Sequence, residues 1–225
     1  MEQTVAKANG YKGPESQLHI FIEREEKTMN KSKFSTKYLV ELALLTAIIL
    51  LMAFTPIGYI KTAGLEITLI VVPVAVGAVI LGPAGGAILG GVFGITSFIQ
   101  CFGMSAFGTL LMGINPVFTF IVCVPTRILE GWLTGLIFQG LCKTKLPKGV
   151  SVTIANLCCP LLNTTFFMGS LVILFESTMR EQLGMTKVFP FIAAFVGING
   201  AIEALVCFGL GAAISGALRK ALRNN

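Results

Sequence analysis

The amino-acid sequence predicts an all-α, polytopic membrane protein with six transmembrane helices and both termini in the cytoplasm. Its 225 residues are 54% hydrophobic and only 12% charged, contain no Asp, and have a mean hydropathy of +0.82. A soluble chain of this length needs more charge to cover its surface. The Lys and Arg residues, which give a net charge of +6, gather in short connections between long apolar stretches. They form no stripe with interleaved aromatic residues, so we expect membrane topology and no nucleic-acid partner.

Residues 1–30 differ in composition from the rest of the chain. They are polar, and their longest apolar run, Ile20–Ile22, is too short for the core of a signal peptide. We expect a disordered leader here, followed by a six-helix transmembrane domain over residues 31–225. Because Met29 directly precedes the first basic cluster, the leader is either an over-long translation start or a regulatory arm.

Six apolar stretches follow the leader, and each can be compared with the roughly 20 residues that cross a bilayer. They cover residues 37–58, 66–82, 84–101, 108–141, 150–176 and 188–218. Gly82-Pro83 separates the second stretch from the third, and this pair breaks a helix without leaving room for a loop. The fourth and sixth stretches exceed one crossing, so we expect part of each to tilt, kink or extend beyond the lipid.

The distribution of basic residues predicts the orientation, because Lys and Arg in short connections stay on the cytoplasmic side. With the N-terminus inside, the inner segments carry nine basic residues and the outer segments three. The inner set is Lys31, Lys33, Lys37, Lys143, Lys145, Lys148, Arg219, Lys220 and Arg223, and the outer set is Lys61, Arg180 and Lys187. An odd number of spans would place one terminal basic cluster outside. We therefore expect six spans in the cell membrane.

The sequence contains no motif for catalysis or for a bound cofactor. Its six cysteines have no C-x-x-C spacing and His19 is the one imidazole, so we expect apolar packing from the cysteines and no metal site. No G-x-x-x-x-G-K-[ST], H-E-x-x-H or G-x-S-x-G motif occurs. We expect neither an enzyme nor a cofactor, and a chain that cannot hydrolyse ATP alone.

Polar side chains at membrane depth are the strongest sign of function, because a charge at the centre of a bilayer costs about 2.5–3.5 kcal/mol on insertion scales. They occur in the last three apolar stretches: Asn115, Thr119, Arg127, Glu130, Asn163, Asn199 and Glu203. We predict that these residues line a chamber that binds a polar solute. Arg127 and Glu130 lie three residues apart on one helix face, so a structural ion pair is an open alternative for these two.

Two acidic residues at depth are too few for a proton relay or an ion channel. The sequence also lacks the inverted repeat of a self-sufficient carrier, so the chain looks like a binding subunit. The connection at residues 56–65 contains Tyr59, Lys61 and two glycines. It is either a hinged lid over the chamber or an ordinary loop.

Small residues at four-residue spacing predict close contacts between helices. One row is Gly82, Gly86, Gly90 and Gly94; a second is Gly131 and Gly135; a third is Ala43 and Ala47. Each row either packs inside the subunit or faces a partner, and the sequence leaves both possibilities open.

Several segments, taken together, carry a resemblance to a known family. They read Ala43-Leu-Leu-Thr-Ala47, Leu65-Glu-Ile-Thr-Leu-Ile-Val-Val-Pro73, Gly77-Ala-Val-Ile-Leu-Gly-Pro83, Asn115-Pro116 and Pro125-Thr-Arg127-Ile-Leu-Glu-Gly-Trp-Leu-Thr-Gly135. In combination, they resemble the substrate-binding S component of energy-coupling-factor (ECF) vitamin importers over about residues 30–220. The Asn-Pro and Pro-x-Arg-Ile patterns are similar to the pantothenate and riboflavin branch of that family.

The resemblance implies a six-helix subunit that captures a vitamin outside the cell and joins two ATPases and a transmembrane coupling protein, which release the vitamin inside. In that family an Ala-x-x-x-Ala pair in the first helix contacts the coupling protein, and Ala43 and Ala47 match it. Pantothenate is the first expected substrate, because its carboxylate, hydroxyl and amide groups suit one Arg with several Asn; riboflavin is the second. A stand-alone solute carrier and a non-transport membrane assembly protein are the alternatives.

Overall fold

The computed structural model describes residues 35–56, 58–62, 65–183, 200–209 and 213. The predicted leader and most of the sixth predicted stretch lie outside the described residues. The chain divides into two units, Met1–Val40 and Glu41–Asn225. Every contact between elements given below lies within the second unit.

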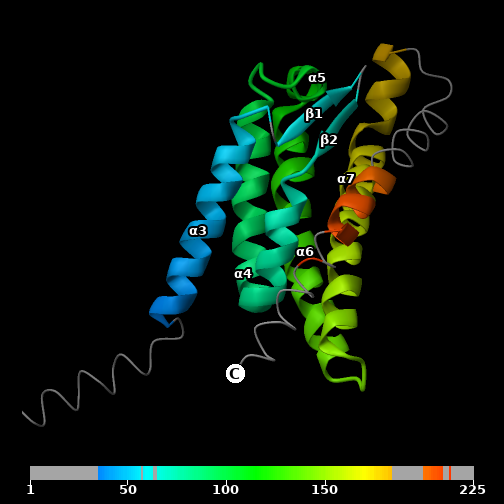
Figure 1. The fold of residues 1–225 in the computed structure, drawn as a ribbon. Helices are drawn as coiled ribbons and strands as arrows, with labels where there is room; N and C mark the ends of the chain where they lie inside the picture. The colour runs from blue at the N-terminus through cyan, green and yellow to red at the C-terminus, as the bar shows by residue number, and fades with distance from the viewer. Residues whose placement is uncertain (1–34, 57, 63–64, 184–199, 210–212, 214–225) are drawn as a thin grey trace, which may run out of the picture. The chain divides into compact units, whose positions relative to one another are not determined.

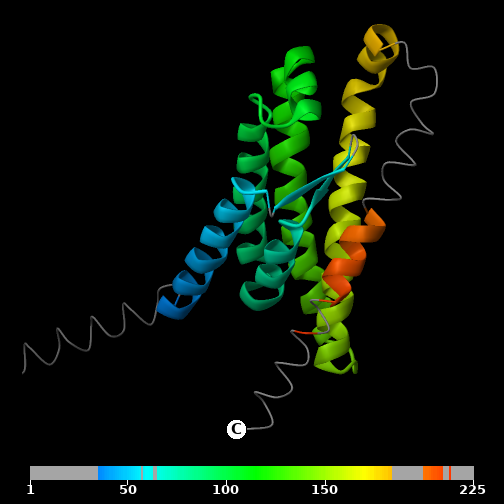
Figure 2. The ribbon, with the colours of Figure 1, turned by 45° about the horizontal axis from the view of Figure 1, so that its top comes forward.

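Helices make up most of the described chain (Figure 1). The elements are α3 (Thr36–Ala53), β1 (Tyr59–Thr62), β2 (Leu65–Thr68), α4 (Val71–Gln100), α5 (Ala106–Ile114), α6 (Pro116–Cys142), α7 (Lys148–Leu183) and a further helix, Gly200–Gly209. Four of them are long and apolar enough to cross a membrane: α3, α4, α6 and the Lys148–Phe175 part of α7. α6 packs against α4 and against α7 (Figure 2). The prediction of a helical protein with several membrane-spanning helices is confirmed.

The strands β1 and β2 form an antiparallel hairpin, which the prediction of an all-α fold did not include. Their pairs run from Tyr59 with Thr68 to Thr62 with Leu65. The predicted second span, 66–82, therefore begins too early, because its first residues belong to β2 and the helix starts at Val71. Residues 65–68 alternate apolar and polar side chains, which is the period of a strand. A count of apolar residues over a long window does not detect so short a pattern.

The chain reverses direction inside α4, at Gly82-Pro83. Gly82 has φ 77° and ψ −171°, a conformation outside the helical region that glycine adopts readily. A Cβ built on Gly86 would lie 2.9 Å from the Cβ of Ala78. Eight residues of uninterrupted helix would separate these positions by about 12 Å. The two halves of α4 therefore run antiparallel and pack on each other, and the predicted helix break is confirmed.

The fourth predicted stretch, 108–141, is two helices. Asn115 stands between α5 and α6 in an extended conformation, and its Oδ1 accepts hydrogen bonds from the backbone N–H groups of Val117, at 3.0 Å, and Phe118, at 3.2 Å. An Asn N-cap followed by Pro at the first helical position is a strong start signal. The excess length of this stretch is explained by α5, which precedes the span.

Glycines bring α4 and α6 into backbone contact. A Cβ on Gly86 would overlap the carbonyl group of Gly131, and a Cβ on Gly131 would overlap that of Gly86. One turn away in α6, a Cβ on Gly135 would lie 2.6 Å from the Cα of Pro83. No side chain larger than a hydrogen atom fits between the helices at these three positions.

The same contact continues along α4 toward Gln100. A Cβ on Gly90 would overlap the carbonyl oxygen of Arg127, and a Cβ on Gly94 would lie 2.8 Å from that of Cys123. The glycine rows of α4 and α6 thus pack against each other inside the subunit. The alternative that they face a partner is wrong for these two rows.

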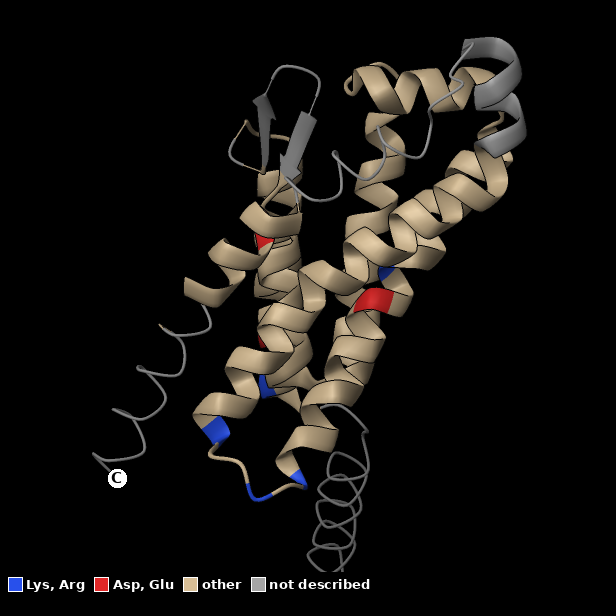
Figure 3. Ribbon diagram, turned by 90° about the vertical axis from the view of Figure 1, so that its right-hand side faces the viewer, with Lys and Arg blue, Asp and Glu red and all other residues tan. Residues whose placement is uncertain are grey.

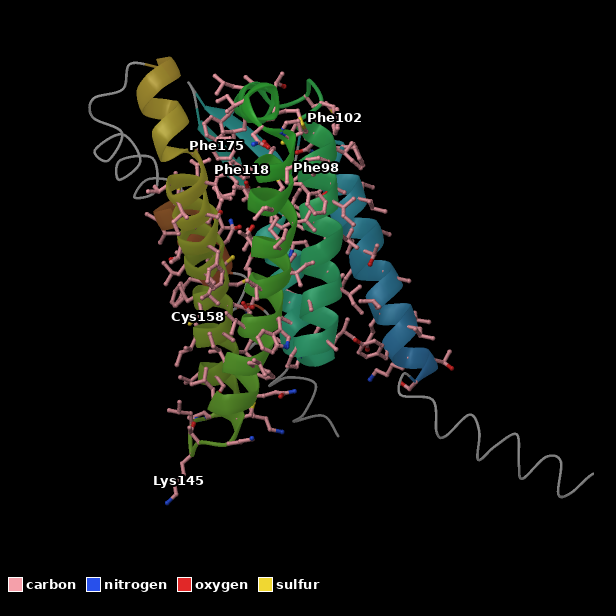
Figure 4. All side chains as sticks on the ribbon, turned by 180° about the vertical axis from the view of Figure 1, so that it is seen from behind. Phe98, Phe102, Phe118, Lys145, Cys158 and Phe175 are labelled. Atoms are coloured by element: carbon pink, nitrogen blue, oxygen red, sulfur yellow. The ribbon has the colours of Figure 1, made fainter. Side chains whose placement is uncertain are left out.

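Aromatic and aliphatic contacts complete the packing of α6 and of α3. The ring of Phe118 in α6 meets that of Phe175 in α7 edge to face, with centroids 5.9 Å apart (Figure 4). α3 places Leu45, Ile49 and Ala53 in the largest apolar cluster of the described chain, together with buried residues of α4. Their four-residue spacing means that α3 buries a single face.

Gly90→Ala should lower the thermal midpoint of the purified protein in detergent. The added methyl meets the Arg127 carbonyl, and overpacking of this kind costs about 1–3 kcal/mol. Gly91→Ala is the matched control, because its Cβ would lie 3.5 Å from the Cγ1 of Ile128, which is an ordinary contact. Thermal unfolding of both variants gives the comparison, and equal midpoints would contradict the packing of α4 on α6.

Candidate functional site

Arg127 lies in the interior of the helix bundle, with 6% of its surface exposed. Its guanidinium carbon is 4.5 Å from the ring centroid of Phe93 in α4 and 5.1 Å from that of Phe167 in α7. Its Nη1 donates to two carbonyl oxygens of its own helix, those of Cys123 at 3.1 Å and Val122 at 3.4 Å. Two aromatic faces and these hydrogen bonds hold the cation in place.

The charge of Arg127 has no direct counter-ion in the described part of the chain. Glu130 is less than one turn away, yet no ion pair within 4 Å joins Arg127 to Glu130 or to Glu203 among the described contacts. The Nε of Arg127 is buried and has no hydrogen-bond partner there. The arrangement therefore gives no support to a structural ion pair of Arg127 with Glu130.

Glu130 is fully buried and contacts α7. Its Oε1 accepts a hydrogen bond from the Sγ of Cys159 at 3.2 Å, while its Oε2 has no partner within the described residues. A buried carboxylate oxygen without a donor is costly, so this oxygen is suited to accept a hydrogen bond from a ligand.

Glu203 lies in the helix Gly200–Gly209 and is 4% exposed. Its Oε1 accepts from the backbone N–H of Thr68 at 3.2 Å, and its Oε2 accepts from the Nδ2 of Asn163 at 3.5 Å. The Oδ1 of Asn163 is buried and has no partner in the described chain. Asn163 thus offers an acceptor beside a carboxylate that is already engaged.

The residues just described form one group, named here the polar cluster: Arg127, Glu130, Cys159, Asn163 and Glu203. Cys159, Asn163 and Phe167 follow one another at four-residue spacing, so they lie on one face of α7. That face meets α6 through Arg127 and Glu130, and it meets Gly200–Gly209 through Glu203. Four of the seven residues predicted to line a chamber are brought together here.

The other three predicted chamber residues are not part of the polar cluster as described. The side chain of Asn115 caps α6, and the Oγ1 of Thr119 donates to the Asn115 carbonyl at 2.9 Å. Both groups therefore have partners within their own helix. Asn199 lies outside the described residues.

Three members of the site were not anticipated from the sequence: Phe93, Phe167 and Cys159. With seventeen phenylalanines in the chain, nothing singles out two of them as partners of an arginine. For α7 a signal does exist, because residues 159, 163 and 167 share the face that carries the predicted Asn163. Reading helix faces around each deep polar residue would have indicated Cys159 and Phe167.

Ala43 and Ala47 are exposed on α3. They are two residues from Leu45, which is buried, and therefore lie on the opposite face of the helix. The exposed face of α3 is accordingly lined by small and aliphatic side chains.

The α6–α7 connection is strongly basic. Lys143, Lys145 and Lys148 are exposed there. Figure 3 shows several blue segments, which mark Lys and Arg, at this end of the helices, and Lys145 projects from the connection in Figure 4. A Cβ on Gly82 would lie 3.4 Å from the Nε2 of Gln139, near the end of α6. The reversal of α4 and the basic connection are therefore at the same end of these helices.

Comparison with known proteins gives two matches. The family model of the ECF transporter, substrate-specific component, matches residues 37–215. The pantothenate transporter PanT of Leuconostoc mesenteroides subsp. mesenteroides is 36% identical over 113 residues, which are 48% of this chain and 53% of that protein. The chain thus spans about half the length of the curated relative that it matches.

Proposed function

Because this chain belongs to the family of ECF transporter substrate-specific components, we propose that it captures pantothenate outside the cell for ATP-driven uptake. Its partners in this proposal are an ECF transmembrane coupling protein and two ATPase subunits, since the chain has no nucleotide-binding motif of its own. The similarity to a pantothenate transporter supports the choice of vitamin. The observation that carries it is that the charge of Arg127 has no counter-ion among the described residues.

A buried guanidinium without a counter-ion is unfavourable in a membrane protein, since neither water nor a carboxylate compensates its charge. A ligand carboxylate supplies that counter-ion and forms charge-assisted hydrogen bonds with it. Pantothenate carries a carboxylate, whereas riboflavin carries none. Arg127, which has no counter-ion in the part of the chain that the structure describes, therefore favours pantothenate over riboflavin.

Two further atoms of the polar cluster have no partner within the described ranges, and they match the rest of the ligand. Glu130 Oε2 and Asn163 Oδ1 are buried acceptors. The two hydroxyl groups and the amide N–H of pantothenate are donors. Asn115, Thr119 and Asn199 are proposed as further ligand contacts on the sequence pattern alone, and Glu203 is assigned to the support of Asn163.

The proposed orientation has six spans and both termini in the cytoplasm. It is supported by the helix pairs that the structure describes, since the reversal at Gly82 and the basic α6–α7 connection share one end. Lys143, Lys145 and Lys148 favour the cytoplasmic side for that end.

Cysteine labelling tests this orientation in a variant whose native cysteines are replaced by Ser or Ala. A membrane-impermeant maleimide added to intact cells should modify a cysteine at Thr62 and spare one at Thr144. The Thr144 variant should react once the cells are permeabilised. Labelling of Thr144 alone in intact cells would reverse the orientation.

Arg127→Ala should weaken pantothenate binding to the purified protein by about 5- to 150-fold, because loss of one partner of a buried polar contact costs about 1–3 kcal/mol. Isothermal titration calorimetry measures the affinity, and thermal unfolding checks the fold. Lys145→Ala removes an exposed cation from the α6–α7 connection and should bind as the wild type does. If the wild type binds riboflavin and not pantothenate, the substrate assignment is wrong.

We further propose that the exposed face of α3 with Ala43 and Ala47 is the contact surface for the coupling protein. Small side chains allow close approach of a partner helix, and the polar cluster draws on other elements. Capture and coupling would then use different surfaces of the subunit.

Replacing Ala43 and Ala47 together by Trp should abolish co-purification with the coupling protein and ATP-driven uptake, because two large side chains hold the partner helix away. The pantothenate affinity of the isolated subunit should not change. Ile48→Trp is a control on the same helix, since Ile48 is exposed but lies about 100° or more around the helix from both alanines. Uptake by the isolated chain in vesicles, without ATPases, would instead indicate a stand-alone carrier.

A further inference from the structure

Glu203 joins three segments that are far apart in the sequence. One carboxylate oxygen accepts from Thr68, the last residue of β2, and the other accepts from Asn163 in α7. Glu203 and Asn163 are 4% and 8% exposed, so solvent does not compete for these hydrogen bonds.

The bond to Thr68 ties the backbone of the hairpin to another element. The next residue, Leu69, donates its N–H to the carbonyl oxygen of Gly58 at 2.9 Å, which closes the hairpin within itself. The Thr68 N–H points instead to Glu203, 135 residues further along the chain. Glu203 therefore links β2 to α7 through its two carboxylate oxygens.

Glu203 and Glu130, the two buried glutamates of the polar cluster, differ in the hydrogen-bond partners of their carboxylate oxygens. Both oxygens of Glu203 have partners within the protein, whereas Glu130 Oε2 has none among the described residues. Glu130 is thus free to accept a hydrogen bond from a ligand, while the bonds of Glu203 are used to hold protein segments together.

We propose that Glu203 is a positioning residue that fastens the β1–β2 hairpin to α7 and to the helix Gly200–Gly209, and so slows the release of a ligand from the polar cluster. The claim that Glu203 fastens the hairpin rests on its two hydrogen bonds, to Thr68 and to Asn163. The effect on release rests on the proposed function.

Hydrogen exchange on the ligand-free protein in detergent tests the fastening. In Glu203→Ala, exchange of the Thr68 amide should be faster by about tenfold or more, the factor expected when a hydrogen bond to a charged group is lost. Glu130→Ala is the matched control and should leave the exchange of the Thr68 amide unchanged, because Glu130 makes no hydrogen bond to β2 within the described chain. Unchanged exchange in Glu203→Ala would overturn the proposal.

Glu203→Gln separates hydrogen bonding from charge. The Gln oxygen still accepts from Thr68, and the Gln amide can donate to Asn163 Oδ1, which has no other partner among the described residues, once the Asn163 amide turns over. Exchange in this variant should stay close to the wild type. If it matches Glu203→Ala, the carboxylate charge and not the geometry is responsible, and the positioning role is wrong. If Glu203→Ala does not fold, Asn163→Ala is used in its place. It removes the hydrogen bond from Asn163 to Glu203, and its Thr68 amide exchange is compared with that of the wild type.

The effect on release is measured with radiolabelled pantothenate. Glu203→Ala should dissociate about tenfold faster with little change in association rate, and Glu203→Gln should dissociate as the wild type does. A lower association rate with unchanged dissociation would overturn the role in release. If the wild type does not bind pantothenate, the proposed function fails, while the exchange experiment still decides the fastening.

Discussion

The close approach of α4 to α6 is the contact on which the rest of the site depends. Helices in lipid gain no hydrophobic free energy when they associate. Their association must therefore be stabilised by close van der Waals packing. Here glycines allow backbone to meet backbone, and Gly90 lies directly against the Arg127 carbonyl. Phe93 follows Gly90 by three residues on the same face, which places its ring over the guanidinium. The interaction that holds the two helices together also builds one wall of the arginine site.

The environment of Arg127 balances two requirements. The helix must remain inserted without a ligand, although a central arginine costs about 2.5–3.5 kcal/mol on insertion scales. Two aromatic faces and two backbone carbonyls offset part of this cost, since a desolvated cation–π contact contributes about 2 kcal/mol. The charge itself is not neutralised by an ion pair among the described residues. The largest remaining gain is therefore left for an anionic ligand, which makes Arg127 a selector of charge in the proposed function.

The sequence predicted the features of this protein that depend on local rules. Gly82-Pro83 breaks a helix in any context, and deep polar residues such as Arg127 and Glu203 are unusual in any membrane span. The β1–β2 hairpin was missed because its strands are short. β1 lies in the predicted connection at residues 56–65, and β2 is half apolar, so it merges with the next predicted span in a hydropathy count. The partners of Arg127 depend on which faces of α4 and α7 meet α6. That choice is made by the packing of the whole bundle, and local patterns in the sequence do not reveal it.

The proposed partner surface and the polar cluster are separate, but a short physical path connects them. The Leu45–Ala53 part of α3 contacts α4 through its apolar row, and apolar contacts are non-directional and tolerate small shifts. It also has a directional tie, because the Nε2 of Gln100 donates to the carbonyl oxygen of Ala53 at the end of α3. Gln100 is in the same half of α4 as Phe93, two turns further along. A displacement of α3 that preserves this hydrogen bond must therefore move the end of the helix that forms one wall around Arg127.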